Sequence, residues 1–164
     1  MDRCGTFAVG IPSAAQIPGS QSAGCPMTND EFIKLLNANS PPALQTLGGE
    51  ILEFDVENKA ARIRYTAGSS LCNPDGGIQG GFICGMLDAA MAHAVFCVLG
   101  DVAIVATLEI KVSYLEVVRQ GELFARGTVI RSGKTVTFLE AELSDADDKL
   151  LATASSTARV IRKK

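Results

Sequence analysis

Residues 73–88 read Asn-Pro-Asp-Gly-Gly-Ile-Gln-Gly-Gly-Phe-Ile-Cys-Gly-Met-Leu-Asp, a glycine-rich loop that opens an apolar segment. The pattern predicts a helix from about Gly80 to Leu99, ended at Gly100. A helix N-terminus presents unpaired backbone N–H groups and the positive end of a dipole, which favour an oxyanion. Asp88 follows about two turns later, and an ionised acid in an apolar helix is costly unless it is paired or used. The segment therefore predicts an oxyanion-binding backbone facing a nucleophile or base.

The residues before this segment predict a short helix and two strands. A capping-box pattern begins at Thr28, and the helix that follows is expected to end at Pro41 and Pro42. From Leu44 onward the pattern turns to strands, at 51–56 and 61–65, joined by a turn at 57–59. Residues 1–27 are rich in small and polar residues and lack periodicity, so we expect a flexible N-terminal tail followed by one domain over 28–164.

The residues after the apolar helix predict four antiparallel strands. In the first of these strands, Leu108 to Tyr114 shows two-residue alternation that sets Thr107 on the polar face. Three more strand patterns occupy 122–131, 135–143 and 149–161, and the first two flank a hairpin at 132–134. A helix that is apolar on every face must be enclosed. The expected fold is therefore α+β, with a curved antiparallel sheet wrapped around a long central helix.

Composition excludes several function classes. The formal charge is −3, and no arginine-rich or aromatic-studded tract is present, so no nucleic-acid partner is expected. The five cysteines form no C-x-x-C pair and the chain has one histidine, so neither a metal site nor a cofactor is expected. Free thiols indicate a reducing, cytoplasmic location. No membrane partner is expected, since no apolar run reaches the ~18 residues that span a bilayer.

The element order, together with Asn73, Gln79-Gly80-Gly81 and Asp88 at their spacing, resembles the hotdog-fold acyl-CoA thioesterases of the phenylacetate-degradation type. The resemblance covers roughly residues 43–161. It implies hydrolysis of an acyl-CoA with an aromatic or medium-chain acyl group, by a homodimer or a dimer of dimers. In this family an Asn, a His-Gly-Gly and an Asp or Glu follow one another at the same intervals. Gln79 stands where the family usually has His, so it keeps hydrogen bonding but does not titrate near neutral pH.

The resemblance also assigns roles to individual residues. The Gly80 N–H would polarise the thioester carbonyl, and Asp88 would activate water or attack, supplied by a neighbouring subunit. Asn73 and Gln79 complete the expected catalytic set, and Thr107 would hold the attacking water. Substrate-binding roles fall to three further residues: Gly81, and Arg131 and Lys134 at the 132–134 hairpin.

Structural interpretations of these residues remain open beside the functional ones. Asp88 can be a buried acid bonded to backbone, Gly80 and Gly81 can serve close helix packing, and Asn73 can simply form a turn. His93 diverges from Asp88 by about 140° around the helix, so it is predicted to be a satisfied core or interface residue. Two other functions also remain open: an acyl-thioester hydratase or dehydratase, and a non-catalytic acyl-CoA-binding protein.

Overall fold

The computed structural model describes residues 28–99 and 102–162, so the predicted tail over 1–27 and the predicted helix end at Gly100 lie outside the described residues. Apart from two short helical segments at 42–46 and 69–71, which were not predicted, the elements follow one another in the predicted order. They are α1 (Asn29–Ala38), α2 (Pro42–Thr46), β1 (Gly49–Asp55), β2 (Ala60–Ala67), a 3-10 turn η2 (Ser69–Leu71), α3 (Gly80–Leu99), β3 (Val102–Tyr114), β4 (Gly121–Ser132), β5 (Val136–Asp145) and β6 (Leu150–Arg162).

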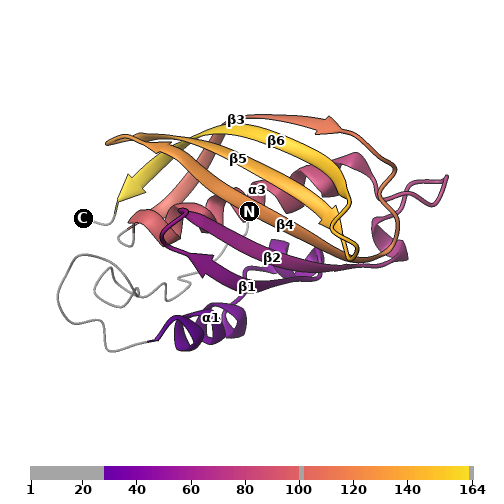
Figure 1. Cartoon of the computed structure of the whole chain (residues 1–164), viewed down its shortest axis with the longest axis horizontal. Coiled ribbons are helices and arrows are strands. Elements are labelled where there is room, and N and C mark those ends of the chain that lie inside the picture. The colour runs from indigo at the N-terminus through magenta and orange to yellow at the C-terminus, as the bar shows by residue number, and fades with distance from the viewer. Residues whose placement is uncertain (1–27, 100–101, 163–164) are drawn as a thin grey trace, which may run out of the picture.

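The six strands form one antiparallel sheet in the order β1-β2-β4-β5-β6-β3. The sheet curves around α3, and β1 and β3 lie at its two edges (Figure 1). Both predicted hairpins are present, between β1 and β2 and between β4 and β5. The predicted hotdog arrangement, a curved antiparallel sheet around a long helix, is therefore confirmed.

The N-terminal part agrees with the prediction except at one helix. The capping box is confirmed, because the Thr28 side chain accepts from the Glu31 N–H and the Glu31 carboxylate accepts from the Thr28 N–H. The expectation of strand from Leu44 onward is wrong, since Pro42 opens the short helix α2 and β1 begins only at Gly49. Proline fits the first helical position because its fixed φ matches the helix and its missing N–H would be unpaired there.

The core lies between α3 and the concave face of the sheet. Buried α3 side chains such as Met86, Leu87 and Met91 pack against inward-facing residues of β2, β4 and β5. Helix and sheet come into close backbone contact at Gly127 of β4, where a Cβ would overlap the backbone of Ala90. Glycine is needed there because no other residue allows that approach.

The prediction that the helix is enclosed on every face is only partly right. Residues Gly80, Cys84 and Asp88, which lie along one line of α3, remain half-buried in the described chain. These three residues lie on the side of the helix next to β3, since β3 provides contacts to both Gly80 and Asp88. A single chain therefore leaves part of the apolar helix uncovered at the β3 side.

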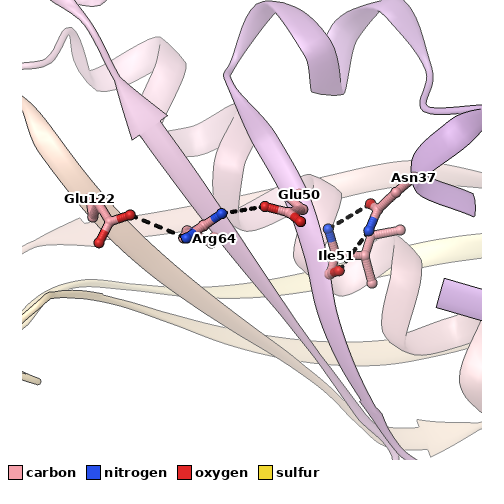
Figure 2. Close-up of polar contacts among 5 residues, drawn as sticks. All are labelled: Asn37, Glu50, Ile51, Arg64 and Glu122. Atoms are coloured by element: carbon pink, nitrogen blue, oxygen red, sulfur yellow. Dashed lines mark hydrogen bonds and ion pairs between the residues drawn. The ribbon is translucent and has the colours of Figure 1, made fainter. Parts of the chain in front are cut away.

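The β1 edge of the sheet is covered by α1. The Asn37 side chain donates to the Ile51 carbonyl and accepts from the Ile51 N–H, each at 2.9 Å (Figure 2). An amide side chain thus takes the place of a further strand at this residue. On the exposed face of the sheet, Arg64 bridges Glu50 and Glu122, which joins β1, β2 and β4 (Figure 2). Such exposed pairs contribute little stability on their own.

Candidate active site

The predicted acid and the predicted threonine meet in the structure. The Thr107 hydroxyl of β3 donates to Asp88 Oδ1 of α3 at 2.7 Å. Asp88 is half-buried and Thr107 is exposed, and no other hydrogen bond to Asp88 is found within the described residues. Since Thr107 occupies one carboxylate oxygen, the second oxygen is left for water or a substrate atom.

A β-bulge brings Thr107 to this position. Thr107 pairs with Ala158 and Glu109 pairs with Thr157, so Leu108 is the extra residue and its side chain is 62% exposed. The Ser156 hydroxyl donates to the Glu109 carbonyl at 2.7 Å beside the bulge. Strict alternation predicted Thr107 on the polar face of its strand, opposite Ile110. This is wrong, because the bulge changes the phase of the strand: Thr107 and Ile110 pair with the buried residues Ala158 and Ser156 and so share one face. Bulges commonly redirect a side chain next to an active site.

The glycine-rich loop ends in an open helix start. The Gln79 carbonyl accepts from the Phe82 N–H at 2.9 Å, so the first turn of α3 closes on Gln79. Within the described residues, the N–H groups of Gly80 and Gly81 have no acceptor. A Cβ at Gly81 would meet nothing within 4 Å, and the Gln79 side chain is exposed. Two donors at the positive end of the helix dipole are therefore left without a partner in the described part of the chain, and the space beside Gly81 is open.

Asn73 organises the loop that precedes this helix. Its side-chain oxygen accepts from the N–H groups of Asp75 at 3.0 Å and Gly77 at 3.1 Å. Its backbone N–H donates to the Gly77 carbonyl at 2.7 Å, and Gly76 has a φ of 77°. The loop role, one of the two interpretations left open by the sequence, is thus present. Both loop hydrogen bonds use the side-chain oxygen of Asn73, so its Nδ2 donor remains available for another partner.

The two predicted basic residues lie away from the helix start. Arg131 and Lys134 are exposed at the hairpin between β4 and β5. β4 passes the middle of α3 where Gly127 touches Ala90, and then continues toward the C-terminal end of the helix (Figure 1). Within one chain, the hairpin and Gly80 are therefore at opposite ends of α3.

Cys84 and Tyr114 belong to the same region and were not predicted as site residues. Cys84, interpreted from sequence as an inert core residue, lies one turn from both Gly80 and Asp88; its i, i+4, i+8 spacing was the available signal. Burial and the nearby Asp88 carboxylate raise the pKa of the Cys84 thiol, which keeps it protonated at neutral pH. The Tyr114 hydroxyl donates to the Gly80 carbonyl at 2.9 Å, a contact between distant parts of the chain with no local sequence signal.

The single histidine takes no part in this arrangement. His93 is buried, and its Nδ1 lies 2.7 Å from the Ala89 carbonyl. Its ring packs edge-on against Phe96. Burial lowers the pKa of His93, so the ring is neutral in the folded protein near pH 7. The prediction of a satisfied core histidine is confirmed.

Comparison with known proteins places this geometry in a family. The model of the thioesterase superfamily matches residues 76–152. The solved structure of a phenylacetic acid degradation-related protein from Ralstonia eutropha JMP134 is 37% identical, with a TM-score of 0.71, and the match covers 77% of this chain and 97% of that one. The chain belongs to the thioesterase superfamily. Its matched region includes the glycine pair, Asp88 and Thr107.

Two further similar proteins extend the comparison. A relative from Saccharolobus solfataricus whose name places it among esterases is 35% identical over 89 residues, which span 54% of this chain and 63% of that protein. The PaaI protein from the phenylacetic acid degradation operon of E. coli shares the fold at 20% identity, with a TM-score of 0.68, and the match covers 76% of this chain and 87% of that one.

In the described part of this chain, no helix is long and apolar enough to cross a membrane.

Proposed function

We propose that the chain hydrolyses acyl-CoA thioesters in a site shared between two copies. The observation that carries this proposal is the Asp88–Thr107 hydrogen bond on the uncovered side of α3, in a chain that belongs to the thioesterase superfamily. A carboxylate with one free oxygen beside open space is suited to activate water or to attack a thioester. Aromatic or medium-chain acyl groups are the substrates we expect first.

The distance along the helix requires the second copy. Gly80 and Asp88 are separated by eight residues, or ~12 Å along the axis, which is too far for one carbonyl group to meet both. β3 is an edge strand, so a second copy can pair with it in the antiparallel direction. That pairing reverses the partner, so the helix start of one subunit is brought toward Asp88 of the partner subunit.

The same reversal assigns roles to the remaining predicted residues. The Arg131 and Lys134 hairpin of one subunit is brought toward the helix start of the partner subunit, where these cations can bind the phosphates of CoA. Asn73 contributes its Nδ2 as a hydrogen-bond donor, because its oxygen is used within the loop. The predicted site residues that are separated within one chain become neighbours in a symmetric pair.

The chemistry follows from these donors and this acid. The N–H groups of Gly80 and Gly81 bind the thioester carbonyl oxygen and stabilise the negative charge that develops on it. Asp88 takes a proton from a water molecule, and the oxygen of that water attacks the carbonyl carbon. Thr107 orients the Asp88 carboxylate during this step. The carbon–sulfur bond then breaks and the electron pair leaves with sulfur as a thiolate. The proton held by Asp88 passes to this thiolate through solvent, which regenerates the carboxylate and gives the free acid and CoA.

Gln79 is compatible with this reaction. An alkyl thiol has a pKa near ~8.5, so the thiolate is a good leaving group and needs no general acid. Gln79 is exposed at the helix start, where its amide can hydrogen-bond substrate. A hydratase or dehydratase would need a histidine paired with a carboxylate across the site, and His93 is buried against Ala89 instead.

A panel of acyl-CoAs with thiol detection tests the proposal. We expect thiol release by the wild type and a loss of at least about a hundredfold in kcat for Asp88→Asn, because the isosteric amide cannot accept the proton. The matched control is Asp75→Asn, which changes an exposed loop carboxylate and keeps wild-type rates. Saturable binding without thiol release would instead identify a binding protein, and enoyl–hydroxyacyl conversion a hydratase.

Mixed oligomers test whether the site is shared. Chains carrying Asp88→Asn and chains carrying Asn73→Ala are each expected to be weakly active alone. When the two are combined, one of the two sites in a mixed dimer has both groups intact, so activity should return. No recovery in verified mixed dimers would show that both groups act from one chain.

A further inference from the structure

One phenol connects the end of β3 to the start of α3. Tyr114, the last residue of β3, donates its hydroxyl proton to the Gly80 carbonyl at 2.9 Å. Gly80 is the first residue of the helix, so the contact is made at the peptide unit that joins Gly80 to Gly81. The N–H of that peptide unit belongs to Gly81, one of the two donors without an acceptor in the described residues.

The two glycines differ in what surrounds them. A Cβ at Gly80 would lie 3.2 Å from both Cζ and Oη of Tyr114, so any side chain there would push the phenol away. A Cβ at Gly81 would meet nothing within 4 Å. Gly80 is therefore needed by the protein itself, to let Tyr114 approach the carbonyl, whereas Gly81 leaves space for a ligand.

A hydrogen bond to a carbonyl acts on the N–H of the same peptide unit. The phenol draws electron density toward the Gly80 oxygen, which makes the Gly81 N–H a stronger donor, by about 10–30% per bond in condensed-phase estimates. The Tyr114 side chain is exposed, and partial desolvation of its hydroxyl, followed by the nearby Cys84, raises its pKa, so the phenol stays protonated and remains a donor at neutral pH. The bond also holds the first turn of α3 in one orientation.

A second phenol on the same helix provides an internal comparison. The Tyr65 hydroxyl donates to the Met86 carbonyl at 2.8 Å, and the Tyr65 side chain is fully buried. Met86 lies in the middle of α3, where the N–H of the next residue, Leu87, can bond within the helix. Tyr65 therefore stabilises the fold, whereas Tyr114 acts on a peptide unit whose N–H is free.

We propose that Tyr114 is a positioning residue of the site, one that orients and polarises the Gly80–Gly81 peptide for the thioester carbonyl. The kinetic effect of Tyr114 rests on the proposed function. The hydrogen bond between Tyr114 and Gly80 does not, because it can be measured without substrate.

Kinetics of Tyr114→Phe and of the matched Tyr65→Phe variant test the proposal in the full chain. For Tyr114→Phe we expect kcat to fall about fivefold, with KM within about twofold, because a transition-state donor is weakened. Its melting temperature and sedimentation should equal those of the wild type. Tyr65→Phe should melt at lower temperature and keep the wild-type kcat. Equal kcat in Tyr114→Phe and wild type, or a loss shared equally by both variants, would overturn the proposal.

A substrate-free measurement separates this inference from the proposed function. In 15N-labelled protein, Tyr114→Phe should move the Gly81 amide resonance and leave the Leu87 resonance in place, whereas Tyr65→Phe should do the reverse. An unmoved Gly81 resonance in Tyr114→Phe overturns the inference, whether or not the wild type releases thiol. A wild type that releases no thiol from any acyl-CoA while the Gly81 shift is seen would refute the proposed function and leave the positioning contact established.

Discussion

The sheet ends differently at its two edges. At β1 the edge is interrupted and covered. Ile51 bonds through its N–H and carbonyl to Asn37 of α1 (Figure 2). A bulge follows at Leu52. At the opposite edge β3 runs for 13 residues, and no described element pairs with its outer side. Proteins commonly blunt an exposed edge because its unpaired groups attract another strand. This chain blunts one edge and leaves the other available.

The difference is also chemical. β3 carries Thr107, which contacts Asp88, and Tyr114, which contacts Gly80. Large apolar side chains on the same strand are exposed, with Ile104 at 53% and Leu108 at 62%. The open edge therefore lies next to the candidate site, whereas the covered edge has only structural contacts. An uncovered edge beside an incomplete site is the arrangement expected when a second copy completes it.

The largest expected effect comes from charging the open edge. Replacing both Ile104 and Leu108 by Lys should prevent two copies from pairing, because like charges would meet across the interface. We expect a ~17 kDa species in sedimentation, native circular dichroism, and at least about a hundredfold loss of thioesterase activity. The matched control, Leu52→Lys at the covered edge, should keep the wild-type size and rate. A wild type that already sediments as a monomer would contradict the pairing.

A tenfold smaller effect is expected inside the open edge, at the bulge. Thr107→Val removes the hydroxyl that orients Asp88 while conserving shape, and should lower kcat about tenfold, as expected for a hydrogen bond to a charged group. Thr107→Ser keeps the hydroxyl and should stay within about twofold of the wild type. If Thr107→Val is as active as the serine variant, the bulge has no role in the chemistry.

The covered edge should respond in stability and not in activity. Asn37→Leu leaves the Ile51 N–H and carbonyl without their partner, and we expect a loss of about 1–3 kcal/mol in the free energy of unfolding, measured by urea denaturation. Asn37→Asp keeps the oxygen that accepts from the Ile51 N–H, so its free energy of unfolding should fall by less at neutral pH. The kcat of soluble protein should be unchanged in both. A fall in kcat without a fall in stability would show that the two edges are not independent.

The smallest effect is expected at the end of the covered edge, in acid. Hydrogen bonds from the Asn58 backbone and side chain, together with Arg126, lower the pKa of Asp55 to about 2. Because this pKa is depressed in the folded state, its stabilisation is present above the unfolded value near ~4 and is lost as pH falls through about 2. Asp55→Asn should therefore flatten the dependence of the free energy of unfolding on pH between those two values. If the variant and the wild type show the same pH dependence, Asp55 titrates alike in the folded and unfolded states.

Local patterns were sufficient for most of the fold. The apolar run after the glycines predicted α3, because an apolar run of this length without proline is too long for an ordinary strand and is typical of a buried helix. The capping box at Thr28 and both hairpin turns act within a few residues, so they too could be found from the sequence. α2 was missed because five residues give no periodicity, and Pro42 looks the same as a helix stop and as a helix start.

The candidate site could be predicted only in part. Asp88 and the glycine pair could be proposed because they lie on one segment, at a spacing that resembles a family pattern. The face of Thr107 was wrong because a bulge depends on how two strands pair, and two-residue alternation contains no information on pairing. The contact between Tyr114 and Gly80 spans 34 residues and was likewise beyond any local pattern.

The sequence by itself thus determined the long helix, the strands of the sheet and most of their order, and where an acid and a glycine-rich helix start occur. These properties follow from dihedral preferences and hydrophobic periodicity, which act over a few neighbouring residues. Only the tertiary structure decided that β1 is covered by Asn37, that β3 is open, and that the bulge at Leu108 directs Thr107 to Asp88. Those outcomes depend on register and on contacts between distant segments, which exist only when the whole chain has packed around α3.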